Sequence, residues 1–91
     1  MKINLQTIHF KANDAIKTFV DDKVGKLARF DSSIISAEVT LTDDGGGLEN
    51  KTCDIRLIVP GNDNFVKKSA ASFEEAIAEC VSALQGVLTA K

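Results

Sequence analysis

The sequence predicts an α+β domain of two layers, in which two helices cover one face of a four-stranded sheet. Two segments, at about 13–30 and 73–88, carry apolar residues at the three- and four-residue spacing of an amphipathic helix. The other segments alternate apolar and polar residues, which is typical of half-buried strands. The predicted order is β-α-β-β-β-α. Because the alternation leaves one sheet face polar, we expect both helices to pack on the other face.

Length and composition are those of one ordinary globular domain. The chain has 91 residues, of which 26% are charged and 44% hydrophobic. Its net charge of −2 argues against a protein that coats nucleic acid by bulk attraction, while a local basic patch stays compatible with it. No segment has the roughly 18 apolar residues of a membrane span, and the N-terminus lacks the apolar run of a signal peptide. We therefore expect a cytoplasmic protein.

Four strands are predicted, the first of which covers residues 2–9. The second carries an apolar set at alternate positions, Ile35, Ala37, Val39 and Leu41, and the third carries Cys53, Ile55, Leu57 and Val59. A glycine-rich tip at about 43–50 joins these two strands into a long hairpin. A tighter turn at 60–63 leads into a fourth strand at roughly 64–71. Since the first two strands are joined through a helix, they are expected to be parallel neighbours.

The first helix has one cation within its apolar stripe. We expect a cap at Asn13 or Asp14 and an end near Arg29. The stripe consists of Ile16, Phe19, Val20, Val24 and Leu27. At roughly 100° per residue, Lys23 lies on that same face. Because an unpaired buried ammonium is very costly, its amine must reach the groove between the helices or an edge of the sheet.

Gly25 lies inside this helix and weakens it by roughly 1 kcal/mol relative to alanine, and it would permit a close approach to a strand.

The second helix begins with a capping box, in which the Ser72 hydroxyl accepts from the Glu75 amide. Its apolar stripe consists of Phe73, Ile77, Cys80, Val81, Leu84 and Leu88.

The sequence offers little for catalysis or for metal binding. His9 is the only histidine, and no motif supplies it with a nucleophile or a second acid. The acidic residues Asp43, Asp44 and Glu49 match no calcium loop, and a hairpin tip explains them more simply. Cys53 and Cys80 show no metal-ligand spacing and are expected to be buried thiols. We therefore predict no enzyme, no catalytic residue, no metal and no cofactor.

Basic residues give the more informative pattern. They lie on the first helix (Lys17, Lys23, Lys26, Arg29) and on the fourth strand (Lys67, Lys68). Each cation that neutralises a phosphate adds a salt-dependent increment of affinity, so several together can hold a nucleic acid. The plainer alternative is a solvated helix flank with scattered lysines. Because aromatic residues are few, a nucleic acid would be held through its backbone and shape rather than its bases.

Longer motifs resemble one family. The segment MKINLQTIHFKANDAIKTFVDDKVGKLARFDSSI resembles the opening of the ribosome hibernation-promoting factors, also called ribosome-associated inhibitors or sigma-54 modulation proteins. Its signs are the alternating strand, a helix ending in K-x-x-K-L-x-x-F, and a following isoleucine-containing strand. IRLIVPG and SFEEAI, farther on, resemble the family's later strand, turn and helix start. The similarity spans essentially the whole chain and implies one hibernation-factor-like, double-stranded-RNA-binding-like domain over residues 1–91.

The resemblance implies a function and partners. Members of the family bind the small ribosomal subunit near its decoding region, where they block messenger and transfer RNA. Lys23 and Lys26 match the motif lysines that face 16S ribosomal RNA, and Arg29, Lys67 and Lys68 are nearby basic positions. The implied partner is the small subunit, with no membrane and no small-molecule substrate. Since the chain reaches only residue 91, we expect it to lack the C-terminal dimerisation domain of the long forms.

Two segments depart from the family pattern. Relatives usually finish the second helix with a dense basic run, whereas this chain reads ALQGVLTAK, with Gln85, Gly86, Thr89 and Ala90 in place of cations and only Lys91 remaining. An F-Y-D-R-I type sequence is replaced by FDSSI at 30–34. Losing about four phosphate contacts would flatten the salt dependence by roughly 3–4 units. The alternative function is therefore a protein-interaction module that keeps the fold and has lost most RNA affinity.

Overall fold

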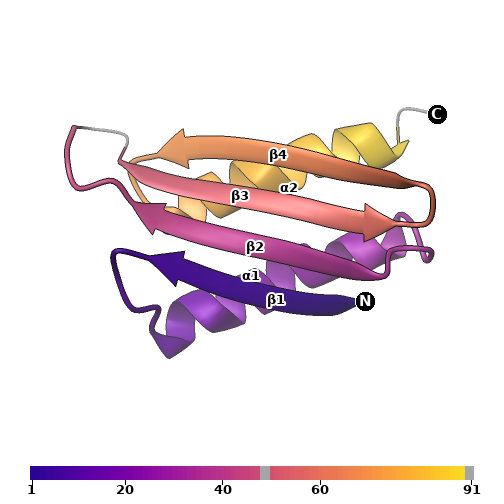
Figure 1. The fold of residues 1–91 in the computed structure, drawn as a ribbon, viewed down its shortest axis with the longest axis horizontal. Helices are drawn as coiled ribbons and strands as arrows, with labels where there is room; N and C mark the ends of the chain where they lie inside the picture. The colour runs from indigo at the N-terminus through magenta and orange to yellow at the C-terminus, as the bar shows by residue number, and fades with distance from the viewer. Residues whose placement is uncertain (48–49, 90–91) are drawn as a thin grey trace.

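The computed structural model describes residues 1–47 and 50–89 and has the predicted α+β architecture. The elements are β1 (Lys2–Ile8), α1 (Asp14–Gly25), the 3-10 turn η1 (Lys26–Arg29), β2 (Ser36–Asp43), β3 (Lys51–Val59), β4 (Asn62–Ala70) and α2 (Phe73–Thr89). Figure 1 shows the four strands side by side in the order β1-β2-β3-β4. β1 is parallel to β2, as predicted, and the other two pairs are antiparallel hairpins.

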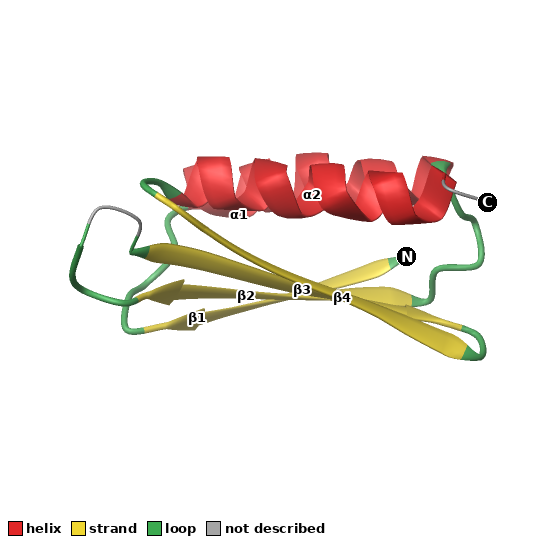
Figure 2. Cartoon of the chain, turned by 90° about the horizontal axis from the view of Figure 1, so that it is seen from above, coloured by secondary structure: helices red, strands yellow, loops and turns green. Residues whose placement is uncertain are grey.

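Both helices pack on one face of the sheet, which confirms the predicted two layers (Figure 2). α1 contacts β1, whereas α2 contacts β3 and β4, and the two helices contact each other. The alternate strand residues Ala37, Val39, Leu41, Cys53, Ile55 and Leu57 are buried beneath the helices. The opposite side, here called the open face, carries the polar residues of each alternation. It is not covered by any described element (Figures 1 and 2).

The predicted helix caps are present. The Asn13 side chain accepts a hydrogen bond from the Ile16 amide at 2.9 Å. The Ser72 hydroxyl accepts from the Glu75 amide at 3.2 Å, which is one half of the predicted capping box. The whole predicted stripe of α2 is buried, and Val20, Val24 and Leu27 form the buried part of the stripe of α1 and η1. The sequence therefore predicted the starts of both helices correctly.

Element ends differ from the prediction in two places. The first α-helix ends at Gly25, and the chain continues to Arg29 as a 3-10 turn. β4 begins at Asn62 instead of about residue 64, because Pro60 and Gly61 alone form the turn and Val59 pairs with Asn62. Gly61 has φ +80°, the conformation that a glycine after proline supplies in a type II turn.

Two single-residue predictions were wrong. Gly25 was expected to allow a close approach to a strand, yet a Cβ placed there would meet nothing within 4 Å. Ile35 was expected to face the core, yet it is 58% exposed, and Ile34 is buried in its place. The regular alternation begins only at Ser36, because the preceding segment still turns back on itself through the hydrogen bond from the Ile34 amide to the Asp31 carbonyl.

Candidate nucleic-acid interface

The end of α1 and the turn η1 present three cations in a row, here called the basic line: Lys23, Lys26 and Arg29. Lys23 lies in the last turn of α1, and the other two lie in η1. In a 3-10 turn, side chains three residues apart project in the same direction, roughly 6 Å apart along the axis. The change from α-helix to 3-10 turn therefore aligns Lys26 with Arg29.

Phe19 accommodates the lysine that interrupts the apolar stripe. The Lys23 ammonium lies 5.6 Å from the centroid of the Phe19 ring, and the Lys23 residue is half-buried. Lys17 and Asp21 line a hollow beside β1, so they mark the flank of α1 at the sheet edge. At roughly 100° per residue, Phe19 and Lys23 lie on the opposite flank, toward α2. Of the two predicted directions for the amine, the structure therefore favours the side of the second helix.

The other two cations of the basic line are exposed. The Lys26 ammonium is 3.9 Å from the Asp22 carboxylate, in a pair whose side chains are 45% and 62% exposed. A pair this exposed contributes little, so an anionic partner could displace Asp22 at small cost. Arg29 is exposed at the end of η1. These cations also lie at a helix C-terminus, where positive charge stabilises the helix itself, so the plainer structural explanation stays open.

The structure does not bring Lys67 and Lys68 to the basic line. Both are exposed on β4, the edge strand on the side of α2 (Figure 1). Being consecutive strand residues, they point to opposite faces of the sheet. Lys67 pairs in register with Asp54 on the open face, and Lys68 pairs with Cys53 on the face that the helices cover. α2 lies between α1 and β4, so it separates Lys68 from the basic line.

The segments that depart from the family pattern have local roles here. α2 is described over Phe73–Thr89 and has no basic residue in its last turn. Ala90 and Lys91, which the prediction also placed at the end of this helix, lie outside the described residues. The Thr89 hydroxyl donates to the Gln85 carbonyl at 2.7 Å. In the segment after η1, the Asp31 carboxylate accepts from the Ser33 amide at 2.9 Å and from the Ser33 hydroxyl. Each feature closes a turn or a helix end.

The acidic hairpin residues bind within the hairpin. The Asp43 carboxylate accepts from the Lys51 ammonium at 2.8 Å and from the Gly45 amide at 3.0 Å, and these contacts hold the pKa of Asp43 below its usual range. Asp44 accepts from the Thr52 hydroxyl at 2.8 Å. Glu49 lies outside the described residues. Over residues 1–47 and 50–89, no group of three or more His, Cys, Asp or Glu could hold a metal ion.

The remaining reactive side chains have structural surroundings. His9 follows β1 with φ +68°, in the left-handed region where histidine is several-fold enriched among non-glycine residues. Cys53 and Cys80 are both fully buried, as predicted, and the Cys80 thiol donates to the Cys53 carbonyl at 3.1 Å. The neighbouring Cys80 side chain, followed by burial, raises the pKa of the Cys53 thiol. Both thiols are fully buried, which is typical of structural cysteines.

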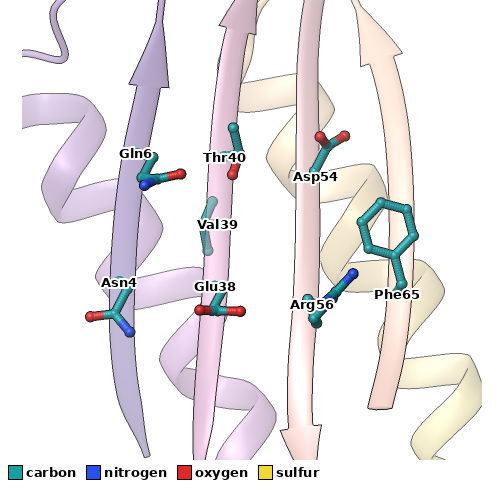
Figure 3. A pocket seen from close by; sticks show the side chains of 8 residues that line it. All are labelled: Asn4, Gln6, Glu38, Val39, Thr40, Asp54, Arg56 and Phe65. Carbon is teal, nitrogen blue, oxygen red and sulfur yellow. The ribbon is translucent and has the colours of Figure 1, made fainter.

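Sequence reasoning missed a hollow of about 500 Å³ on the open face (Figure 3). Side chains from all four strands line it, among them the carboxylate of Asp54 and the ring of Phe65. The available signal was an aromatic residue at a solvent-facing position of a strand, since Phe65 is 58% exposed.

No described helix is long and apolar enough to span a membrane.

Known proteins show the same fold. The N-terminal domain of Protein Y from Thermus thermophilus matches with a TM-score of 0.85 and 24% identity, covering 99% of this chain and 98% of that one. A ribosomal subunit interface protein from Coxiella burnetii matches with a TM-score of 0.87 and 13% identity, covering 99% and 96%. No curated protein matched the chain. The family model described as "Sigma 54 modulation protein / S30EA ribosomal protein" matches residues 3–90, and the chain therefore belongs to this family.

Proposed function

We propose that this protein is a ribosome-associated translation inhibitor of the hibernation type. In this proposal residues 1–91 act as one domain in the cytoplasm, bind 16S RNA of the small subunit near the decoding region, and block messenger and transfer RNA sterically. Family membership supports it, as does the likeness to a protein named for the ribosomal subunit interface. The observation that carries it is the basic line of Lys23, Lys26 and Arg29.

Electrostatic binding through this line requires no catalysis and no cofactor. Three phosphate contacts would make the logarithm of affinity fall by roughly 2–3 units per tenfold rise in salt. The weak Lys26–Asp22 pair and the exposed Arg29 cost little to redirect toward phosphate. Because the last turn of α2 has no cation, the basic line must supply most of this attraction. We therefore expect ribosome binding that is sensitive to salt.

Co-sedimentation with ribosomes at low salt tests the proposal. Lys23→Glu/Lys26→Glu should abolish pelleting and relieve inhibition of translation in a cell-free reaction, because it reverses two charges of the basic line. Lys11→Glu/Lys17→Glu is the matched control, since it makes the same charge change near the start of α1 and should pellet nearly as well as wild type. Failure of the wild type to pellet, or equal loss in both double variants, would contradict an RNA contact at the basic line.

A second candidate is a protein-interaction module that keeps the fold. It is favoured by the absence of cations in the last turn of α2 and by large apolar side chains exposed near that end of the molecule, Phe30 at 45%, Ile35 at 58% and Val87 at 53%. Its test is an affinity purification from lysate with wild type and Val87→Asp. Recovery of a single protein without ribosomal RNA, lost in Val87→Asp and kept in Lys23→Glu/Lys26→Glu, would favour this candidate over ribosome binding.

A further inference from the structure

The open face contains a second candidate site, unrelated to the basic line. The hollow there, about 500 Å³ in volume, lies on the open face (Figure 3). Both helices pack on the opposite face of the sheet (Figure 2). Amide side chains of Asn4 and Gln6 come from β1, the Glu38 carboxylate from β2, and Asp54 and Arg56 from β3. Phe65 closes the hollow from β4.

Phe65 and Arg56 form a platform on which a planar group can stack. Phe65 is 58% exposed, and the Arg56 guanidinium carbon lies 5.8 Å from the centroid of its ring. The two residues are direct cross-strand partners. In Figure 3 the ring presents its face to the open side, with Asp54 and Arg56 beside it on β3. Exposed aromatic rings on a polar sheet stack nucleic-acid bases, and a neighbouring arginine adds a cation.

Asp54 supplies an acceptor that lacks a donor. Its Oδ1 atom is shielded from solvent and accepts no hydrogen bond from any described residue. A buried acceptor without a partner is costly. Because Asp54 lines the hollow, a turn of its carboxylate toward a bound ligand would let Oδ1 accept a hydrogen bond and would remove that cost. Glu38 adds a second carboxylate to the same hollow, opposite Arg56 on the neighbouring strand.

Guanine matches this set of groups best among the bases. It offers the N2 amino donor, and its N1–H lies beside it on the same edge, so that one carboxylate can accept both hydrogens. Its O6 and N7 atoms are the acceptors that arginine prefers. Asn4 and Gln6 can donate further. A protein segment fits less well, because charged groups are depleted from the centre of protein interfaces.

We propose that the open face binds an unpaired guanine of single-stranded RNA, stacked on Phe65 and held through its donors by Asp54. Arg56 and the amides contact the acceptor edge, and Lys67, on the same face, meets the adjoining phosphate. The site lies on the layer opposite the basic line, so the two surfaces can be occupied together. It does not depend on the proposed function, because an RNA strand needs no ribosome to reach it.

Fluorescence anisotropy with labelled 5′-UUGUU-3′ and 5′-UUAUU-3′ at low salt tests this site. The guanine strand should bind roughly tenfold more tightly than the adenine strand, as expected for one good bidentate contact. Phe65→Ala should weaken binding by about fivefold or more through lost stacking, and Phe65→Trp should restore it. Phe30→Ala is the matched control, because it removes an exposed ring outside the open face. Asp54→Asn should remove the preference for guanine, whereas Asp63→Asn should keep it.

Three results would overturn the proposal. Equal affinity for the two strands would exclude guanine recognition, and unchanged binding by Phe65→Ala would exclude the stacking platform. Guanosine monophosphate binding as tightly as the pentamer would assign the site to a free nucleotide and not to an RNA strand. Lys23→Glu/Lys26→Glu should keep the preference for guanine over adenine, so the two surfaces can fail separately.

Discussion

At the scale of single residues, Lys23 occupies a position where the helix repeat would place an apolar side chain. The ring of Phe19, one turn earlier, lies 5.6 Å from its ammonium, and the Lys23 residue is half-buried. The sequence predicted that a cation would interrupt the apolar stripe, but it did not predict which way the Lys23 amine would point. Both predicted directions, toward the groove between the helices and toward the sheet edge, are compatible with the helix repeat. The choice depends on where α2 packs, which is a tertiary contact.

The buried cysteines give a prediction at the same scale. Both thiols are fully buried, and the pKa of Cys53 is raised by its contact with Cys80 and by burial. We therefore expect neither thiol of the native protein to react with a disulfide reagent within minutes, and both to react in denaturant. The measurement is the time course of the reaction between the protein thiols and the disulfide reagent, with and without urea. Rapid reaction of one thiol in the native state would show that β3 and α2 separate easily.

Asp43 gives a pH-dependent prediction. Its hydrogen bond with Lys51, aided by the Gly45 amide, holds the pKa of this carboxyl group in the folded state below its usual range. The stability that this carboxylate contributes is therefore fully present above the ordinary pKa of an aspartate, and it is lost as pH falls through the folded pKa. Asp43→Asn should flatten the loss of stability at acid pH, as measured by urea titrations at a series of pH values. If the stability of the variant falls with pH as it does in the wild type, the contact with Lys51 does not stabilise the protein in solution.

At the scale of elements, the first helix and its 3-10 extension were predicted as one continuous helix. Sequence patterns locate such a segment well, because the stripe through Val20, Val24 and Leu27 is periodic, but hydrogen bonds decide between the two helix types at its end. Gly25 lies at the junction with φ −58° and ψ −28°, and a Cβ there would meet nothing within 4 Å.

Gly25→Ala should therefore stabilise the protein. Alanine adopts this backbone conformation without strain and loses less chain entropy on folding, which is worth about 0.5–1 kcal/mol. Thermal or urea denaturation would measure the gain. A loss of stability would reveal a contact that the open space around Gly25 does not suggest.

The last turn of α2 provides a prediction about binding. Gly86 is exposed, and a Cβ there would meet nothing within 4 Å. Gly86→Lys should tighten binding to small subunits and steepen the salt dependence by about 0.7–0.9 units, if one new phosphate contact forms. Gly86→Ala is the control, since it raises helix propensity without adding charge. Equal effects of the two variants would show that the end of α2 does not face RNA.

At the scale of the whole molecule, the two-layer fold determines which cations can act together. Alternation in the strands and the capped amphipathic helices predicted the layers, because these patterns are local. They could not show that α2 separates Lys68 from the basic line, or that Lys67 faces the other layer. The hollow on the open face was likewise unpredictable, since it combines side chains of four strands that only the sheet brings together.

The central claim is that the basic line meets 16S RNA on the ribosome. A photoreactive amino acid in place of Lys26, irradiated in a complex with purified small subunits, tests it most directly. The expected result is a crosslink to 16S RNA near the decoding region, with little or none from the same probe in place of Lys17. Crosslinks to ribosomal protein alone, or equal RNA crosslinking from both positions, would contradict it.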